Sequence, residues 1–359
     1  MNDTLNDILS TSKRPVKILI IKPSALGDIV HSLPFLAAVH KRYPEAEIHW
    51  VVAKGLHTFL EGHPLIERLW IMNKDGWKKI SRIRQTLPEI KRFWKGLRAE
   101  HFDISVDLSG LLRSGLITWA AGARCKLGFS DSDEGSPFFY THKIQGGDQI
   151  HAIDRYLKLA RLLDCDTSQI EYPFPPLPAV SELSASLPAE FCIMAPSAGK
   201  EANRWPAERF GQLAAKLPLP TVVISSPADS HIVEEVVATS NGKAINLAGQ
   251  TGLKELVSLI AKARFFICND TGPMHIAAAL DVPVFALFGP ANPVRTGPYG
   301  TSHTIIRETL PCSPCYAQKP CTKYTWRCMN DLTVEKVLHV IQAIRLKAEK
   351  KPTGSRDNT

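Results

Sequence analysis

Long apolar runs are missing from this 359-residue chain. No stretch approaches the roughly 18 consecutive apolar residues that a membrane-spanning helix needs. The first residues also lack a basic segment followed by a long apolar stretch, so we expect no signal peptide. These two absences predict a cytoplasmic protein without a transmembrane segment.

Familiar dinucleotide and P-loop motifs are missing as well. The turn after the first apolar run reads KPSALGDIVHSLP, from Lys22 to Pro34, and contains neither GxGxxG nor GxxxxGK. The glycine fingerprint is also absent from a second turn, NDTGPM at 269–274. An NAD-dependent oxidoreductase is therefore disfavoured.

The composition is that of an ordinary globular protein, with 44% hydrophobic and 22% charged residues. The chain is longer than one hydrophobic core usually supports, so we expect two domains. Its net charge of +8 indicates an anionic partner such as nucleic acid, a phosphorylated lipid or a membrane surface. No nucleic-acid recognition motif accompanies the charge, so we expect no nucleic-acid partner.

Short apolar segments alternate with helix-length amphipathic segments along the whole chain. This βαβ order predicts an α/β fold of two Rossmann-like domains, each with a doubly wound parallel sheet. In the first half we expect strands at 16–21, 47–53, 68–72 and 103–107 and helices at about 28–42 and 77–98. In the second half we expect strands at 191–195, 221–225, 244–247, 265–268 and 283–288, with helices between them, including 207–217, 253–263 and 272–280.

A proline-rich segment separates the two halves. Residues 172–178, YPFPPLP, hold four prolines in seven residues, and such a segment is stiff and unable to join a central strand. The predicted organisation is a disordered N-terminus (1–15), a Rossmann-like domain (16–171), a linker (172–187), a second Rossmann-like domain (188–330), a helix that could pack back on the first domain (331–346) and a disordered tail (347–359). The loops at the carboxyl ends of the strands are expected to line a cleft.

The strongest chemical signal is FFICNDTGPMHIAAAL at 265–280, where an apolar strand runs into a turn and a helix. The free N–H groups of the first helical turn, with the helix dipole, suit a phosphate group. Gly272 lets the phosphate approach closely, and the hydroxyl of Thr271 adds a donor. Asp270 could be only an N-cap. His275, one turn into the helix, either reaches the same phosphate or is structural.

A second signal follows the first strand, where Pro23, Ser24 and Gly27 make a tight turn into a helix. Asp28 stands at the start of that helix, at the carboxyl edge of the sheet, where a base could face the cleft. Its alternative role is an N-cap, since Asp is a preferred residue there. His31 lies three residues later on the same helix face and, taken alone, is more often structural.

The loop PSAGKEANRWPAERF at 196–210 offers two cations for a diphosphate. Lys200 would act as a point charge and Arg204 through its planar fork. A solvated surface loop is the alternative. Asp229 follows a predicted strand, where a carboxylate can accept hydrogen bonds from ribose hydroxyls.

Two further features have two interpretations each. The late cysteines have the spacing C-x2-C-x5-C-x6-C, which allows a structural zinc held by Cys312, Cys315, Cys321 and Cys328 or a reduced or partly oxidised loop. The stretch 77–98 is either a membrane-surface or anionic-acceptor platform or an ordinary solvated helix. Its cations are Lys78, Lys79, Arg82, Arg84, Lys91, Arg92, Lys95 and Arg98, interleaved with Trp77, Phe93 and Trp94.

Together these segments resemble the lipopolysaccharide heptosyltransferases of glycosyltransferase family nine, and most of all its heptosyltransferase I members. The resemblance covers about residues 16–344. It is carried by KPSALGDIVHSLP, IHWVVAKG, DLSGLLRSG at 107–115, HAIDR at 151–155, RWPAERF, NDTGPMHIAAAL and FGPANP at 288–293.

The resemblance implies a GT-B fold, an acceptor-binding first domain and a donor-binding second domain. It implies inverting transfer of heptose from ADP-heptose to the Kdo region of the lipid A inner core, at the inner face of the cytoplasmic membrane. We expect a monomer that requires no cofactor or divalent metal. By resemblance Asp28 is the general base. The resemblance implies donor binding by Asp229, Asp270, Thr271, Gly272 and His275, to which we add Lys200 and Arg204 from the loop at 196–210. It implies acceptor binding by Arg113 and His151, to which we add Ser24, Gly27 and His31 from the turn after the first strand.

The chain departs from the family pattern at three places. Asn203 stands where the family often has Lys, so Lys200 or Arg204 must substitute. The segment 133–137, DEGSP, replaces an Arg-Glu-Pro element, so one acceptor-binding cation is missing. The late cysteines look more like heptosyltransferase II. A heptosyltransferase II-like or III-like transferase with another inner-core acceptor is therefore the alternative. A non-catalytic nucleotide-sugar-binding protein is another, and it would keep the 270–272 turn without needing Asp28.

Overall fold

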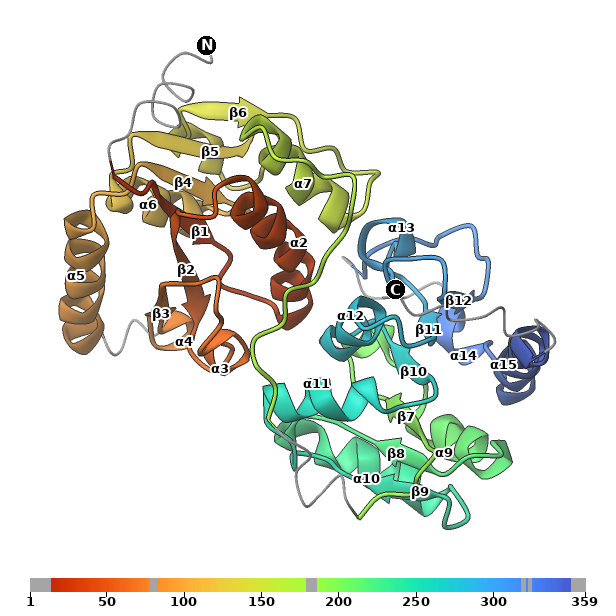
Figure 1. The fold of residues 1–359 in the computed structure, drawn as a ribbon. Helices are drawn as coiled ribbons and strands as arrows, with labels where there is room; N and C mark the ends of the chain where they lie inside the picture. The colour runs from red at the N-terminus through yellow and green to blue at the C-terminus, as the bar shows by residue number, and fades with distance from the viewer. Residues whose placement is uncertain (1–13, 78–82, 179–185, 318–320, 322–324, 350–359) are drawn as a thin grey trace, which may run out of the picture. The chain divides into compact units, whose positions relative to one another are not determined.

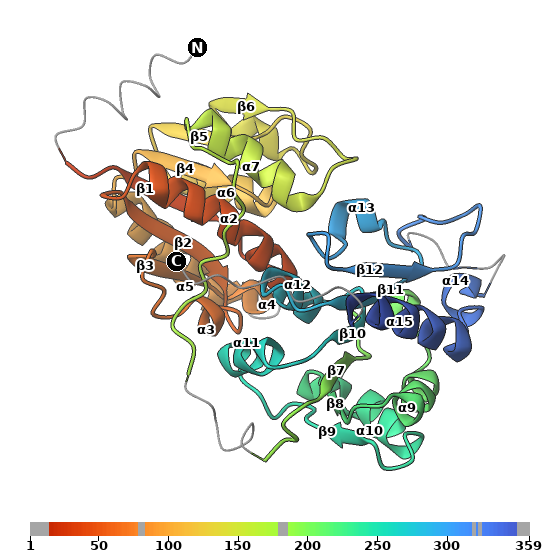
Figure 2. The same cartoon turned by 45° about the vertical axis from the view of Figure 1, so that its right-hand side comes forward.

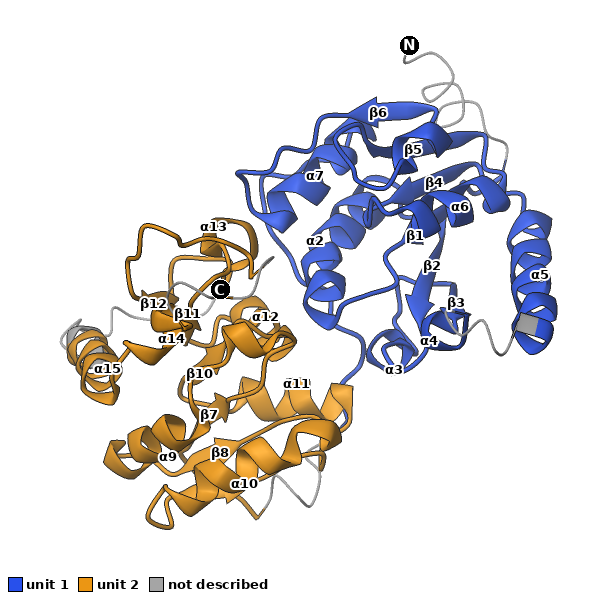
Figure 3. Cartoon of the chain, turned by 180° about the vertical axis from the view of Figure 1, so that it is seen from behind, with its two compact units in different colours: residues 1–178 blue, residues 179–359 orange. Residues whose placement is uncertain are grey.

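The computed structural model describes residues 14–77, 83–178, 186–317, 321 and 325–349. It divides into two compact units, Met1–Pro178 and Ala179–Thr359, coloured blue and orange in Figure 3. The boundary falls inside the segment 172–187 for which the sequence predicts a linker. Residues 1–13 and 350–359 of the expected disordered ends, and 78–82 of the basic stretch, lie outside the described residues.

Unit 1 is built on a six-stranded parallel sheet in the order β3-β2-β1-β4-β5-β6 (Figure 1). Its strands are β1 Lys17–Ile21, β2 Glu47–Ala53, β3 Arg68–Met72, β4 Ile104–Asp107, β5 Cys125–Phe129 and β6 His142–Ile144. Its helices are α2 Leu26–Arg42, α3 His57–Leu60, α4 Lys74–Trp77, α5 Ile83–Ala99, α6 Leu112–Ala121, η2 Ser136–Phe139 and α7 Ala152–Leu162.

Helices cover both faces of this sheet, because successive side chains of a strand point to opposite faces. On one face Leu19 and Ile21 of β1 pack in a core with Leu97 of α5 and Ile117 of α6. Ile18 and Ile20 alternate with them and are fully buried. Helices α2 and α7 lie side by side in both Figure 1 and Figure 2 and contact each other.

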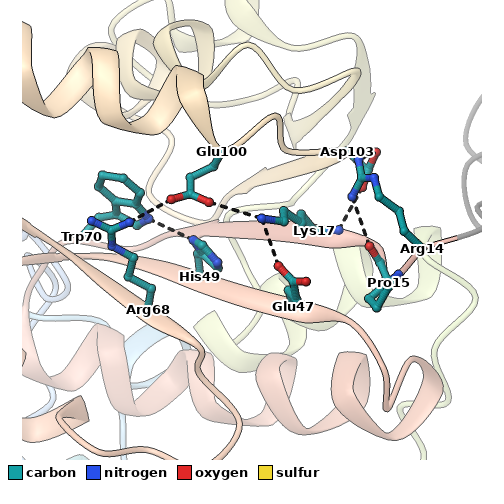
Figure 4. A network of polar contacts seen from close by, with 9 residues as sticks. All are labelled: Arg14, Pro15, Lys17, Glu47, His49, Arg68, Trp70, Glu100 and Asp103. Atoms are coloured by element: carbon teal, nitrogen blue, oxygen red, sulfur yellow. Dashed lines mark hydrogen bonds and ion pairs between the residues drawn. The ribbon is translucent and has the colours of Figure 1, made fainter.

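A polar network holds the amino ends of the unit 1 strands together (Figure 4). The Nζ of Lys17, the first residue of β1, lies 3.1 Å from the carboxylate of Glu47 and 3.3 Å from that of Glu100. Arg68 of β3 contacts the same Glu100 carboxylate at 2.8 Å. These contacts fix the strands at the edge opposite to the one where the sequence motifs emerge.

Unit 2 repeats the architecture, with the strand order β12-β11-β10-β7-β8-β9 and parallel pairing throughout. Its strands are β7 Cys192–Ala195, β8 Thr221–Val223, β9 Ala244–Asn246, β10 Phe266–Asn269, β11 Val284–Phe288 and β12 Thr304–Arg307. Its helices are η3 Glu201–Asn203, α9 Ala207–Lys216, η4 Pro227–Asp229, α10 Ser230–Ala238, α11 Leu253–Ala261, α12 Gly272–Ala279, α13 Pro293–Thr296, α14 Arg327–Asn330 and α15 Val334–Glu349. The predicted doubly wound parallel sheets are confirmed.

The last helix, α15, belongs to the core of unit 2. Its Val337 and Ile341 are buried with Leu213 of α9 and Leu332. The predicted helix at 331–346 is present, and the suggestion that it could also pack back on the first domain stays a prediction. The helix also continues to Glu349, past residue 347 where a disordered tail was expected to begin. No helix in the described parts of the chain is both long and apolar enough to cross a membrane.

Candidate functional site

The carboxyl ends of β1 and β4 are neighbours in the unit 1 sheet, where Ile21 pairs with Asp107. Chain order reverses at this pair, because β2 and β3 extend the sheet on one side and β5 and β6 on the other. Loops that leave such a pair of strands diverge, and in open α/β sheets ligands bind in the resulting crevice. The motifs KPSALGD and DLSGLLRSG both leave the sheet at this point.

Asp28 lies in the first turn of α2, whose N-cap is Ala25. One carboxylate oxygen, Oδ2, accepts the backbone N–H of Ala25 at 2.9 Å. The other, Oδ1, accepts the hydroxyl of Tyr156 at 3.2 Å and lies 3.4 Å from the Nζ of Lys22. The side chain is still 40% exposed. Asp28 is therefore not the N-cap but a partly exposed carboxylate held by three donors.

Lys22 and Tyr156 are two residues of this site that sequence reasoning missed. Lys22 is 5% exposed, and its Nζ also donates to the carbonyl oxygen of Leu108 at 3.3 Å. Burial opposes its charge, but Asp28, Tyr156 and Asp107 outweigh that effect and raise the pKa of Lys22 above its ordinary value, so it stays an ammonium. Burial raises the pKa of Tyr156 to about 12, so its phenol keeps the proton that it donates to Asp28.

The predicted acceptor residues near Asp28 have structural contacts of their own. The hydroxyl of Ser24 accepts a hydrogen bond from Lys74 at 3.0 Å, and Gly27 is buried in the first turn of α2. His31 is 3% exposed, and its ring meets the edge of the His151 ring with centroids 4.9 Å apart. Ser24 thus lies just before α2, Gly27 and His31 lie in α2, and His151 lies at the start of α7.

His151 also caps α7. It is the N-cap residue of that helix, and its Nδ1 accepts the N–H of Ile153 at 3.2 Å. This contact gives one ring nitrogen a structural role that was not predicted for His151.

Arg113 lies in the first turn of α6, beside the segment 133–137 that departs from the family pattern. The carboxylate of Glu134 accepts the N–H of Leu112 at 3.1 Å. Since helix starts attract anions, an anionic acceptor group at this position would meet a carboxylate already in place. In the segment where the family cation is missing, the carboxylate of Glu134 therefore occupies the N-terminus of α6.

A buried carboxylate holds the loop after β4. Asp107 is fully buried; it accepts the N–H groups of Ser109 and Gly110 at 2.8 and 3.1 Å and the hydroxyl of Tyr140 at 2.7 Å. Burial raises its pKa, and the hydrogen bonds oppose that shift. Asp107 therefore supports the motif loop from inside the unit.

Unit 2 has the equivalent reversal at β7 and β10, where Ala195 pairs with Cys268. The next residue, Asn269, is fully buried and joins the two loops that leave these strands. Its amide nitrogen donates to the carbonyl oxygen of Pro196 at 2.6 Å, and its amide oxygen accepts the N–H of Trp205 at 3.1 Å. Sequence reasoning passed over Asn269, although a polar residue ending a buried strand was a usable signal.

Asp270 is the most perturbed carboxyl at this edge. It is only partly exposed, and burial raises its pKa to about 6, with the charge of Lys200 acting in the opposite direction. The amide of Asn203 donates to its Oδ2 at 3.2 Å. The N-cap of α12 is Thr271, without a side-chain capping bond, so Asp270 is not the N-cap.

The start of α12 has the form expected for a phosphate site. Gly272 is the first helical residue and Pro273 the second, so the first turn begins without a bulky side chain. His275 is 7% exposed and lies one turn into the helix. Unpaired N–H groups and the helix dipole make such a start favourable for an anion.

The two predicted diphosphate cations are hydrogen-bonded within unit 2. The Nζ of Lys200 donates to the carbonyl oxygen of Tyr316 at 2.8 Å. Arg204 donates to the carbonyl oxygen of Ala198 at 3.0 Å and pairs with Asp229 at 3.2 Å. Asp229 and Arg204 therefore neutralise each other, and a ribose or diphosphate at this point would have to compete with that ion pair.

The four late cysteines differ in burial. All are free thiols, and Cys328 is buried. Burial raises the pKa of Cys328 to about 11, and the other three thiols act in the same direction. Among the described residues, no group of three His, Cys, Asp or Glu side chains is placed to hold a metal ion. The zinc interpretation therefore stays a prediction.

Comparison with known proteins gives a family for this arrangement. Residues 90–325 match the family described as glycosyltransferase family 9 (heptosyltransferase). The chain is 29% identical to lipopolysaccharide heptosyltransferase 1 of Pseudomonas aeruginosa over 321 residues, which cover 86% of this chain and 88% of the relative. It is 28% identical to lipopolysaccharide heptosyltransferase 2 of Salmonella typhimurium, over 81% of this chain and 88% of the relative.

A solved structure supports the fold. The Escherichia coli heptosyltransferase WaaC with ADP superposes with a TM-score of 0.75 at 23% identity, covering 91% of this chain and 99% of that protein. The predicted GT-B fold is confirmed.

Proposed function

The chain belongs to glycosyltransferase family 9 and is a glycosyltransferase, and from this premise we propose a specific reaction. The proposed reaction moves heptose from ADP-heptose to the Kdo region of the lipopolysaccharide inner core, with inversion at the anomeric carbon. The observation that carries the proposal is Asp28, a partly exposed carboxylate fixed by Lys22 and Tyr156 at the strand reversal of unit 1.

In the proposed mechanism Asp28 is the general base. Its carboxylate takes the proton from an acceptor hydroxyl as that oxygen attacks the anomeric carbon and the bond to ADP breaks. One base suffices for a direct displacement, which inverts the configuration. Lys22 and Tyr156 hold the carboxylate in place through an ion pair and a hydrogen bond. A positioned base of this kind contributes about 10²–10⁴-fold in rate.

In this mechanism residues of unit 2 bind the leaving group, ADP. Negative charge develops on ADP as the glycosidic bond breaks, and the N–H groups at the start of α12 suit a diphosphate. Lys200 supplies positive charge on the same side, since it already acts on Asp270. We assign Thr271, Gly272 and His275 to the diphosphate, and Asp229 with Arg204 to the ribose side.

The test is release of ADP from ADP-heptose with and without a Kdo-lipid A acceptor. The proposal expects ADP release that depends on the acceptor. ADP-heptose binding without acceptor-dependent turnover would instead support a non-catalytic nucleotide-sugar-binding protein. The same assay in EDTA tests the proposal that no divalent metal is required, because turnover should then persist.

A heptosyltransferase II-like activity is the second candidate. Identity to a heptosyltransferase 2 is 28%, close to the 29% found for a heptosyltransferase 1. Glu134 at the start of α6 and the late cysteines favour this alternative, whereas GDIVHSLP and DLSGLLRSG favour the first. Measuring turnover with acceptors that carry or lack a first heptose distinguishes the two activities. The proposal expects turnover of the acceptor that lacks heptose.

Two further properties complete the proposal. The acceptor is anchored in a bilayer, so we place the enzyme peripherally at the inner face of the cytoplasmic membrane. We also expect it to act as a monomer, which analytical ultracentrifugation tests directly.

A further inference from the structure

One surface of unit 1 combines exposed cations with exposed apolar side chains. The cations form a stripe on α5, where Arg84, Lys91, Lys95 and Arg98 recur at intervals of seven, four and three residues and are all exposed. That spacing places them on one face of a helix. The only acidic residue of α5, Glu89, points away from this stripe by the same spacing and is reached by the amide of Asn73 at 3.5 Å. Among the described residues, none of the four cations forms an ion pair.

The neighbouring helix α6 presents an apolar stripe. Leu112, Leu116 and Trp119 are spaced at i, i+4 and i+7, and Leu112 and Trp119 are 45% and 54% exposed. Helices α5 and α6 pack against each other, and the ring of Trp119 meets that of Trp94 from α5 with centroids 6.2 Å apart. The aromatic pair therefore joins the cationic stripe to the apolar one.

A third element extends the apolar side. Phe138 of η2 is 91% exposed, the largest exposure among the exposed large hydrophobic side chains of the described chain. Helix α6 packs against η2, and Glu134, just before η2, hydrogen-bonds the α6 start at Leu112. We call the combined surface the α5–α6 face: Arg84, Lys91, Lys95 and Arg98, with Leu112, Leu116, Trp119 and Phe138.

We propose that the α5–α6 face docks on a bilayer containing anionic phospholipid. Clustered cations near a helix surface are attracted to anionic headgroups, and Trp and Phe prefer the boundary between headgroups and acyl chains. Charge complementarity favours an anionic lipid surface over an acidic protein, because such a surface accepts both the cations and the exposed apolar side chains beside them. The inference deepens the proposed function, since it names the face that meets the membrane-borne acceptor.

The test is co-sedimentation of the full chain with vesicles of phosphatidylcholine, alone or mixed with phosphatidylglycerol at low and high salt. The wild-type chain should bind the mixed vesicles at low salt and lose binding at high salt. A Lys91→Glu/Lys95→Glu variant should bind at least about 30-fold more weakly, from about 1 kcal/mol for each cation removed. A Trp119→Ser/Phe138→Ser variant should also bind more weakly. The matched control is Lys41→Glu/Lys143→Glu, which changes the net charge equally on exposed lysines of α2 and β6.

Two results would overturn the docking face. The first is no binding of the wild-type chain to mixed vesicles at low salt. The second is an equal loss in the Lys41→Glu/Lys143→Glu control, which would mean that net charge alone decides. Far-UV circular dichroism establishes that each variant is folded. Turnover of a water-soluble, deacylated acceptor should be unchanged in all variants, so failure of docking is distinguishable from failure of the proposed reaction.

Discussion

Replacing Asp270 with Asn should stabilise unit 2 at neutral pH while leaving stability near pH 4 almost unchanged. The carboxyl is partly buried, and burial raises its pKa to about 6 from an ordinary value of 3.8. Between these two values the folded chain binds the proton more tightly than the unfolded chain. The free-energy cost of the buried carboxylate is therefore absent below about pH 4, grows up to pH 6 and is complete above it.

The size of the effect follows from the shift. About two pKa units correspond to about 3 kcal/mol, an upper bound because the side chain is partly exposed. Asn keeps the shape and can still accept the hydrogen bond from Asn203, so the substitution removes the charge and little else. For a unit of this size about 1–3 kcal/mol raises the melting temperature by roughly 2–10 °C.

The assay is thermal unfolding of wild type and Asp270→Asn at pH 4 and pH 7.5. The transition of unit 2 is identified in the wild type as the one whose melting temperature rises when ADP is added. The matched control is Asp229→Asn, which breaks the ion pair with Arg204 and should not stabilise at either pH. A stability difference that is the same at both pH values, or a destabilised Asp270→Asn at pH 7.5, would refute the reasoning. ADP affinity should fall in Asp270→Asn if the carboxyl also orders the donor loop.

Three more substitutions test the contacts on which the sites depend. Lys22→Met removes the ammonium 3.4 Å from Asp28 and should lower kcat by about 10- to 100-fold, as for one charge-assisted hydrogen bond, with ADP affinity unchanged by calorimetry. Tyr156→Phe removes one neutral hydrogen bond to the same carboxylate and should lower kcat by about 3- to 10-fold; a larger loss than in Lys22→Met would contradict this order of importance. Asn269→Ala strands the N–H of Trp205 and the carbonyl of Pro196 inside unit 2, so urea unfolding should show a loss of about 2–4 kcal/mol together with weaker ADP binding.

Much of the fold could be predicted from local pattern. The expected strands at 47–53 and 68–72 match β2 and β3 at both ends. Strands β5 and β6 were not predicted, because CKLGF mixes Lys and Gly with apolar residues and β6 has only three residues. These strands form by pairing at the side of the sheet beyond β4, and the local sequence pattern does not indicate that pairing. The helix α15 was predicted, but the sequence pattern does not indicate that its apolar side chains are buried in the unit 2 core.

The candidate site was predictable only where a residue follows a strand. The 270–272 turn follows β10 directly, and Asp28 lies in the first turn of the helix that follows β1, so chain order alone places both at the carboxyl edge of a parallel sheet. The contact between Asp28 and Tyr156 joins residues 128 positions apart and arises because α2 packs on α7. The ion pair between Arg204 and Asp229 is also formed by residues that are not neighbours in the sequence. The sequence predicts both as donor-binding residues but does not predict that they contact each other.

The central claim is that Asp28 is the general base of a heptosyl transfer from ADP-heptose. Its most direct test is acceptor-dependent ADP release by Asp28→Asn at saturating substrates, with the ADP dissociation constant measured on the same sample. We predict a rate at least about a hundredfold below wild type and an unchanged dissociation constant. A rate near that of the wild type would contradict the role of Asp28.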